Sequence, residues 1–350
     1  MSTGWWDRLL ARWNAYWFPQ TTTKHLAICR IIAVGAQLFW FFPRLDEHLN
    51  LLAKNSTFIQ PQLLIRAITA LLPRELLFTP SAFSIFYWLT VALGIAALVG
   101  LFTRTALFLF AVGISVLIAH LYSYGDRHHN EALFVFFLVS LAFAPSGDEL
   151  SVDALLRRRK VARPKNRAKS PGMSDLAMWP LRFAHVLLAM TYFSTGVSKL
   201  IAGGPRWMNG YTLQGYTFAD ALNRDIPLGM WLAQHHTAAI LLSVFTILFE
   251  TFFFVSLLVP WAAPLFFLTG IFFHIGLYVT AGHDFYQHMV LNFMLLLFLT
   301  PEWWRAWLNR HLGRYLSWWR PAGGGCPGSL ALSSTDCFST STEAASTSTD

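Results

Sequence analysis

Charged residues are scarce in this sequence. Asp, Glu, Lys and Arg together make up 13% of the 350 residues, whereas a soluble domain carries about 25%. Hydrophobic residues reach 55% and aromatic residues 16%. This composition excludes an ordinary soluble domain. We therefore predict an all-α fold, a polytopic transmembrane helical bundle of about eight spans with additional interfacial helices.

Cysteine is also scarce, with three residues in the chain. Cys29 lies in an apolar run, and Cys326 and Cys337 lie in a segment rich in Gly, Ser and Thr. Three such cysteines do not make a disulfide framework. The N-terminal stretch lacks a basic start followed by a short apolar core and a cleavage site, so we expect no secretory signal peptide.

The motifs of several enzyme classes are missing. The sequence has no Walker loop, no Gly-rich dinucleotide fingerprint and no Gly-x-Ser-x-Gly elbow. Its twelve histidines do not form the HxxxH and HxxHH boxes of membrane desaturases and hydroxylases. His274, His283 and His288 are nine and five residues apart, a spacing that does not stack ligands on one helix face. We therefore expect neither a metal nor a nucleotide cofactor.

Long apolar runs define the predicted membrane domain, which covers residues 21–302. The expected spans are 25–43, 82–102, 105–123, 131–145, 178–199, 238–260, 262–281 and 285–300. Residues 1–20 and 303–320 combine Trp with Arg at helical spacing, which predicts helices lying in the membrane interface. Residues 62–72 predict a short amphipathic helix. Residues 321–350 are of low complexity and are expected to be disordered.

A basic run at residues 157–169 indicates the orientation. It holds eight of the 26 Lys and Arg residues and no acidic residue. Nucleic-acid binding is one interpretation, but between two membrane spans a cytoplasmic anchor is favoured. We therefore expect an integral membrane protein with lipid as its surroundings, no nucleic-acid partner, and both termini in the cytoplasm. The connections 44–80, 124–130, 200–237 and 281–284 then lie on the opposite face.

Lys199 is the central candidate residue. Tyr192, Thr195 and Gly196 share one helical face with it, because offsets of three, four and seven residues align. A lysine at the end of a span is either an anchor whose ammonium reaches the interface or a base that apolar surroundings keep neutral. His128, His129 and His283 come from connections on the same face, which would build the mouth of an active site.

Two further ionisable residues lie inside predicted spans. His274 and Glu250 are both surrounded by apolar residues in the sequence. Ionisable groups inside a membrane are costly, so a functional role or a mutual pair is expected for each. Arg30, in the first span, is a predicted partner of Glu250.

Motifs in a fixed order resemble a known family. They occupy residues 22–35, 92–104, 129–145, 151–156, 192–200, 207–211 and 272–274. The most informative are Tyr192-Phe-Ser-Thr-Gly-Val-Ser-Lys-Leu200, Trp207-Met-Asn-Gly-Tyr211 and Phe272-Phe-His274. The ordered set resembles the horizontally transferred transmembrane domain, which is the membrane half of the vitamin K-dependent gamma-carboxylase family.

The resemblance implies a chemistry. In the carboxylase, the lysine of this motif deprotonates reduced vitamin K; the oxygenated quinone then removes a proton from glutamate, and carbon dioxide adds. The matching residues here are Lys199, His274 and His129, with Asn130 as the alternative match to the family's histidine. These would be catalytic, with a reduced quinone as cofactor. Tyr192, His128, Asn130, His283 and Trp207 are the predicted substrate-binding residues.

The sequence departs from the carboxylase in one respect. The carboxylase continues into a large luminal portion that helps to hold its glutamate-bearing substrate, whereas this chain has about fifty residues after its last predicted span. Relatives with the membrane domain alone include sporulation-delaying protein B, which helps to mature a secreted peptide. Two functions therefore stay open: a bacterial inner-membrane enzyme acting on a quinol or another lipid-soluble substrate, and a non-catalytic maturation or export partner of a secreted peptide or protein.

Overall fold

The computed structural model describes residues 4–54, 60–73, 78–125, 129–160 and 172–312. The described residues are predominantly helical, as predicted. The helices are α1 Trp5–Trp17, α2 Thr23–Phe39, α3 Leu45–Leu52, α4 Leu63–Leu71, α6 Pro80–Val99, α7 Thr103–Tyr122, α8 His129–Phe143, α9 Val152–Lys160, α10 Trp179–Gly203, η2 Gly204–Asn209, α11 Tyr211–Arg224, α12 Pro227–Gln234, α13 His236–Phe252, α14 Val255–Leu258, α15 Ala263–Ala281, α16 Tyr286–Phe298 and α17 Glu302–Leu312. Two short strands, β1 Thr21–Thr22 and β2 Met173–Ser174, pair antiparallel.

The eight predicted spans all coincide with helices, but not all are long enough to cross a membrane. By length and hydropathy, α6, α7, α10 with η2, and α15 qualify, and α12 with α13 would count as a fifth span despite a 101° bend between them. The helices α2, α8, α13 and α16 have 17, 15, 17 and 13 residues. At 1.5 Å per residue they reach about 20 to 26 Å, less than the roughly 30 Å of a hydrocarbon core. By length and composition, four or five of the eight expected spans therefore qualify as full spans among the described residues.

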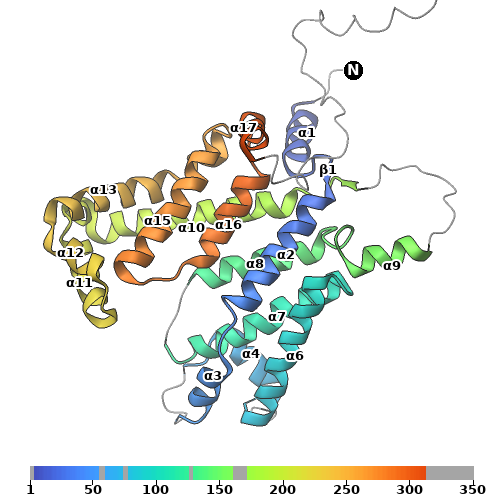
Figure 1. Ribbon diagram of the computed structural model, residues 1–350, viewed down its shortest axis with the longest axis horizontal. Helices are drawn as coiled ribbons and strands as arrows, with labels where there is room; N and C mark the ends of the chain where they lie inside the picture. The colour runs from blue at the N-terminus through green and yellow to red at the C-terminus, as the bar shows by residue number, and fades with distance from the viewer. Residues whose placement is uncertain (1–3, 55–59, 74–77, 126–128, 161–171, 313–350) are drawn as a thin grey trace, which may run out of the picture.

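The core of the bundle lies where α2, α7, α8, α10 and α16 meet. Its fully buried side chains include Phe110, Phe134, Phe137 and Leu188, and α10 packs against α8, α13 and α16. Figure 1 shows α1, α9 and α17 along the upper and right side, and α3, α4, α11 and α12 along the lower and left side. Charge counting groups these segments in the same way, and the placement of the two groups on opposite membrane faces stays a prediction.

Arg30 does not pair with Glu250, so that prediction is wrong. The buried guanidinium donates hydrogen bonds to the carbonyls of Ser146 and Leu150, at 2.9 and 2.5 Å, in the connection between α8 and α9. This connection provides carbonyl oxygens that a helical pattern does not reveal. They accept hydrogen bonds from the two terminal nitrogens of the guanidinium, while Nε has no hydrogen-bond partner among the described residues.

Residues 200–237, expected as a connection, are themselves largely helical. Four residues of α10 follow Lys199, and η2, α11 and α12 continue the chain before α13 begins. The amphipathic helix expected at 62–72 is α4. The helices expected near both ends are α1 and α17. The predicted disordered tail, 321–350, lies outside the described residues, as does most of the basic run.

Candidate functional site

The C-terminal half of α10 lines a cavity of about 360 Å³. Thr191, Tyr192, Thr195 and Lys199 all border it, as their shared helical face predicts. Gly196 lies on the side of α10 that faces α13. A Cβ atom there would stand 2.6 Å from Thr251 Oγ1 and 2.7 Å from the Thr251 backbone nitrogen. The absence of a side chain at Gly196 therefore permits the close approach of the two helices.

This close approach places Lys199 against Glu250. Their Nζ and Oε2 atoms are 2.5 Å apart, and the side chains are 26% and 7% exposed. Lys199 Nζ also lies 5.5 Å from the ring centroid of Trp207, on η2. The lysine thus points toward α13 and an aromatic ring, with one carboxylate beside it. An anchoring lysine would instead extend its ammonium away from the bundle.

A second polar group lies at the buried wall of the cavity. Tyr192 Oη is 2.7 Å from His274 Nε2 on α15, and Asn292 Nδ2 on α16 donates to the same oxygen at 3.2 Å. Because Tyr192 Oη accepts from Asn292, its own hydrogen is available to His274 Nε2. His274 is 4% exposed and Asn292 is fully buried. Three helices therefore meet in one hydrogen-bonded group, with the Tyr192 hydroxyl at its centre.

The remaining walls are aromatic and aliphatic, and they include Phe273, Phe285, Leu213 and Leu277. The Tyr192 ring packs against Phe249 and Phe253, which do not line the cavity, with ring centroids 5.1 and 4.4 Å apart. Apolar walls with a few placed polar groups are typical of small-molecule sites.

The rim of the cavity includes His283, which was predicted, and Asp220, which was not. His283 Nε2 lies 3.0 Å from Asp220 Oδ2 and joins the α15–α16 connection to α11. Both residues line the cavity, as does Trp207. Asp220 and the buried Asn292 were missed because neither lies in a quoted motif. Asn292 follows His288 by one helical turn, and this spacing was the available signal.

The predicted residues near the start of α8 cannot be joined to the cavity. His128 lies outside the described residues. His129 and Asn130 begin α8, but their side chains also lie outside the described part of the structure. Their proposed roles remain predictions.

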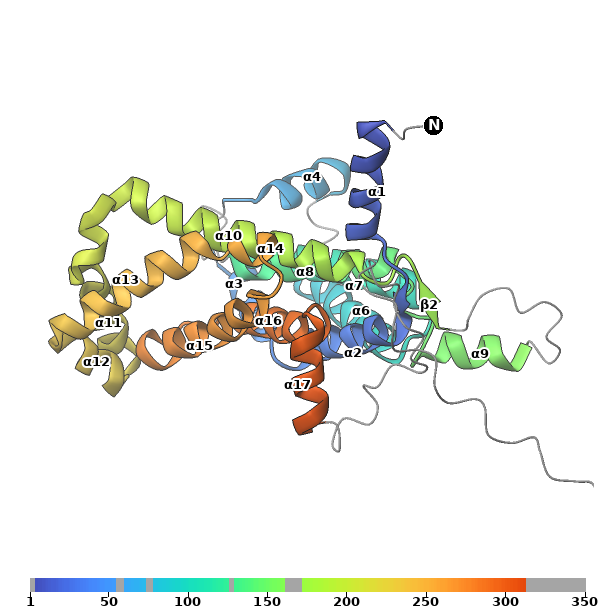
Figure 2. The same cartoon turned by 90° about the horizontal axis from the view of Figure 1, so that it is seen from above.

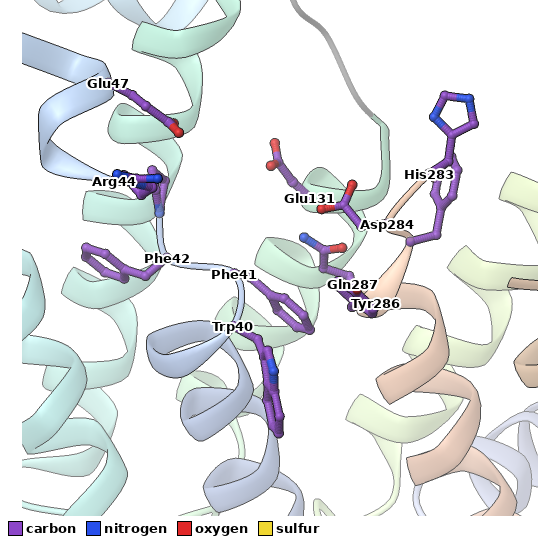
Figure 3. A pocket seen from close by; sticks show the side chains of 12 residues that line it. Trp40, Phe41, Phe42, Arg44, Glu47, Glu131, His283, Asp284, Tyr286 and Gln287 are labelled. Atoms are coloured by element: carbon purple, nitrogen blue, oxygen red, sulfur yellow. The ribbon is translucent and has the colours of Figure 1, made fainter. Parts of the chain in front are cut away.

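Glu131, the next residue, borders a second cavity of about 290 Å³. Its carboxylate accepts a hydrogen bond from the Tyr122 hydroxyl. Figure 3 shows Glu131, Asp284 and Gln287 on one side of this space, with Phe41 and Trp40 below them. His283 and Phe285 line both this cavity and the Lys199 cavity. The two spaces are therefore neighbours.

Among the described residues, no group of three or more His, Cys, Asp or Glu is placed to hold a metal ion.

The chain was compared with family models, with curated proteins and with solved structures. The family model of the HTTM domain matches residues 19–303, a range that contains every residue lining the Lys199 cavity. No curated protein and no solved structure matches the chain.

Proposed function

Because the chain belongs to the HTTM domain family, the membrane domain of vitamin K-dependent gamma-carboxylase-like proteins, we propose that it is a membrane enzyme. In this proposal the Lys199 cavity binds a quinol or a similar flat, lipid-soluble and weakly acidic molecule. Lys199 removes the proton from its hydroxyl group. The observation that carries the proposal is the Lys199–Glu250 pair at the wall of a largely apolar cavity.

The pair allows a lysine to act as a base without leaving an uncompensated charge. An ammonium next to a carboxylate and an amine next to a carboxylic acid contain the same number of protons and the same net charge. Burial disfavours charged forms, so it brings the second arrangement closer in free energy than it is in water. The amine of Lys199 then accepts the hydroxyl proton: the substrate O–H bond breaks and an N–H bond forms. The new ammonium pairs with the substrate anion.

The cavity also fits the shape of such a substrate. A volume of about 360 Å³ lies within the range of roughly 300 to 1,000 Å³ for small-molecule sites. Phe273 and Phe285 provide apolar surfaces for a flat ring, while Lys199 and the Tyr192–His274 pair provide polar contacts at separate points of the wall. A role for His129 stays a prediction from the family resemblance.

The proposal includes an orientation and a location. The Lys199 cavity would face the outside of a bacterial inner membrane, with both termini in the cytoplasm. The basic residues Arg157, Arg158 and Arg159 on α9 support this orientation, because basic segments between spans remain in the cytoplasm.

Lysine substitution provides the test. A quinol anion reacts with dissolved oxygen faster than the neutral quinol does. Purified protein in lipid nanodiscs is therefore given a reduced naphthoquinone, and quinol-dependent oxygen uptake is measured against empty nanodiscs. We expect Lys199→Ala and Lys199→Arg each to lower the rate at least about 100-fold, because a positioned base contributes roughly 10²- to 10⁴-fold and arginine stays protonated. Lys54→Ala, at an exposed lysine of the α3–α4 connection, is the matched control and should keep the full rate.

Two results would count against the enzyme. Full activity in Lys199→Arg would show that only a positive charge is needed. If nanodiscs with the unsubstituted protein take up oxygen no faster than empty nanodiscs, the proposed quinol reaction is wrong. Binding is measured separately as the part of the tryptophan-fluorescence quenching by oxidised naphthoquinone that is lost in Trp207→Phe, since Trp207 lines the cavity.

The second candidate function is a non-catalytic partner in the maturation or export of a secreted peptide. The second cavity favours it, because Glu47, Glu131 and Asp284 line a space that has aromatic walls. Carboxylates and aromatic rings together suit a cationic side chain. Under this alternative, Glu131→Gln and Asp284→Asn would reduce release of the peptide, and Lys199→Arg would leave it unchanged.

A further inference from the structure

A third cavity, of about 270 Å³, lies at the other end of α10. Arg182 lines it and precedes Lys199 by 17 residues, which corresponds to about 26 Å along a helix. Residues from α1, α14, α15 and α17 also contribute to its wall. The cavity is therefore separate from the proposed quinol site and is not explained by it.

The charge at this third cavity is of one sign. Arg182 and Arg305 line it, and none of its lining residues is acidic. The Arg182 guanidinium lies 4.4 Å from the centroid of the Tyr16 ring and donates a hydrogen bond to the carbonyl of Ala15 at 3.4 Å. Neither arginine forms an ion pair with a carboxylate among the described residues. Two guanidinium groups in one concave site favour an anion with several oxygen atoms.

A buried hydroxyl group provides an independent indication. Thr300 lines the cavity and is 7% exposed, and its Oγ1 has no hydrogen-bond partner within the described part of the chain. Leaving a buried hydroxyl group without a partner costs free energy. An anionic oxygen in the cavity would accept its hydrogen. The other polar residues, His185 and Ser256, already bond to each other at 2.8 Å.

The surroundings indicate that the anion is attached to an apolar molecule. Met178, Leu257, Phe298 and Leu299 form apolar parts of the wall. The neighbouring helices α1 and α17 both carry exposed tryptophans: Trp5, Trp6 and Trp13 on α1, and Trp303 and Trp307 on α17. Figure 2 shows these two helices leaving the bundle on opposite sides. Exposed tryptophans next to arginines are typical of the membrane–water boundary.

We propose that this cavity binds the phosphate group of an anionic phospholipid. Arg182 and Arg305 pair with the phosphate oxygens, Thr300 donates a hydrogen bond to one of them, and the acyl chains extend along the apolar wall toward the exposed tryptophans. The bound lipid would hold α1 and α17 against the bundle. This inference does not depend on the quinol reaction, since it concerns a different cavity.

Lipid binding by the full chain provides the test. The protein is purified in neutral detergent, supplied with equal amounts of phosphatidylglycerol and phosphatidylcholine, and analysed by native mass spectrometry and thermal unfolding. We expect selective retention of phosphatidylglycerol and a higher unfolding temperature. The double variant Arg182→Gln/Arg305→Gln should weaken retention at least about tenfold, and Thr300→Val about two- to fivefold. Arg66→Gln, at an exposed arginine of α4 on the other side of the bundle, should change neither.

Two controls are needed, one for a folding defect and one for the source of the phosphate. The double variant Arg182→Lys/Arg305→Lys keeps both charges and should regain part of the retention, which a misfolded protein would not. Inorganic phosphate at millimolar concentration should not reproduce the rise in unfolding temperature. If it does so without a preference for phosphatidylglycerol, the lipid assignment is wrong. If phosphatidylglycerol and phosphatidylcholine are retained equally, and Arg182→Gln/Arg305→Gln does not change their retention, the proposed phospholipid site is wrong.

Discussion

At the scale of single residues, the buried histidines fall into three groups, one of which is His185 alone, bonded to Ser256 at the third cavity. His274 and His288 lie at the Lys199 cavity, where His274 contacts the Tyr192 hydroxyl. His48 and His120 form a separate pair with their Nδ1 atoms 3.0 Å apart, and their Nε2 atoms have no hydrogen-bond partner among the described residues. Two facing nitrogens share a hydrogen bond only when one donates and the other accepts. The second pair is therefore a packing feature that requires at least one neutral ring.

This pair makes stability depend on pH. Burial, with a smaller contribution from His120, lowers the pKa of His48 from 6.5 to about 3. The unfolded chain therefore binds a proton as the pH falls below about 6.5, while the folded chain does not until about pH 3. Stability is full above pH 6.5 and declines as the pH falls toward 3. We expect a lower unfolding temperature at pH 5.0 than at pH 7.5, and a smaller difference in His48→Gln. An equal drop in both proteins would contradict the assignment.

Residue types and the family resemblance together identified much of the cavity but not its pairing. Lys199, Tyr192, His274, Trp207 and His283 were all singled out in the sequence, and all line one cavity. Their chemical roles remain predictions. The pairing of Glu250 was predicted wrongly because a sequence shows that a buried carboxylate needs a cation without showing which cation its helix approaches. That choice depends on the contact between α10 and α13 at Gly196.

At the scale of elements, the ordered motifs divide into two sets. The first set holds one side of the bundle together. Asp153 accepts hydrogen bonds from the backbone and hydroxyl of Thr103, at 2.8 and 2.7 Å, and from the backbone of Phe102 at 3.0 Å. Burial raises the pKa of Asp153, but these hydrogen bonds together bring it below its ordinary value. Gly100 has φ +74°, and a Cβ there would stand 2.3 Å from Ser151 Cβ.

The second set of motifs, from residue 192 onward, lines the Lys199 cavity. The resemblance by itself did not separate residues that build the bundle from residues that face the cavity. The distinction depends on positions along the helices: Arg30 meets the α8–α9 connection and Asp153, on α9, meets the start of α7, whereas Lys199 meets α13. Contacts between segments far apart in the sequence decide which residues build the bundle and which face the cavity. The periodicity of residues within one helix does not reveal these contacts.

The contact at Gly196 gives a prediction for the α10–α13 pair. In Gly196→Ala the new methyl group would meet Thr251 at less than 3 Å, including its backbone nitrogen, so the helices must separate. We expect a loss of about 1 to 3 kcal/mol in stability and a large loss of quinol-dependent oxygen uptake, because Lys199 and Glu250 move apart. Gly215→Ala, on α11, meets nothing within 4 Å and should leave both unchanged. Equal effects of the two substitutions, measured by thermal unfolding, would rule out the packing argument.

At the scale of the whole molecule, the three cavities are arranged along the bundle. The Lys199 cavity and its neighbour share His283 and Phe285, and the proposed phospholipid site lies near the other end of α10. Charge counting assigned the basic run and the Lys199 region to opposite faces but predicted no third cavity, and the assignment of faces stays a prediction. The shorter lengths of α2, α8, α13 and α16 were not predicted, because apolar residues continue past the helix ends into turns that the hydropathy pattern does not distinguish.

The assignment of faces gives the last prediction. Single cysteines are introduced at Asn223 on α11 and at Arg158 on α9, both exposed, after Cys326 and Cys337 are replaced by serine; the buried Cys29 is retained. A membrane-impermeant maleimide should label Asn223→Cys in intact cells and Arg158→Cys only after permeabilisation, because basic segments such as α9 stay in the cytoplasm. The parent with Cys29 alone should remain unlabelled. The reverse pattern would place the Lys199 cavity on the cytoplasmic side of the membrane. The arginines of the third cavity would then face the outer leaflet. Anionic lipid is concentrated in the cytoplasmic leaflet, so that result would also weaken the case for the phospholipid site.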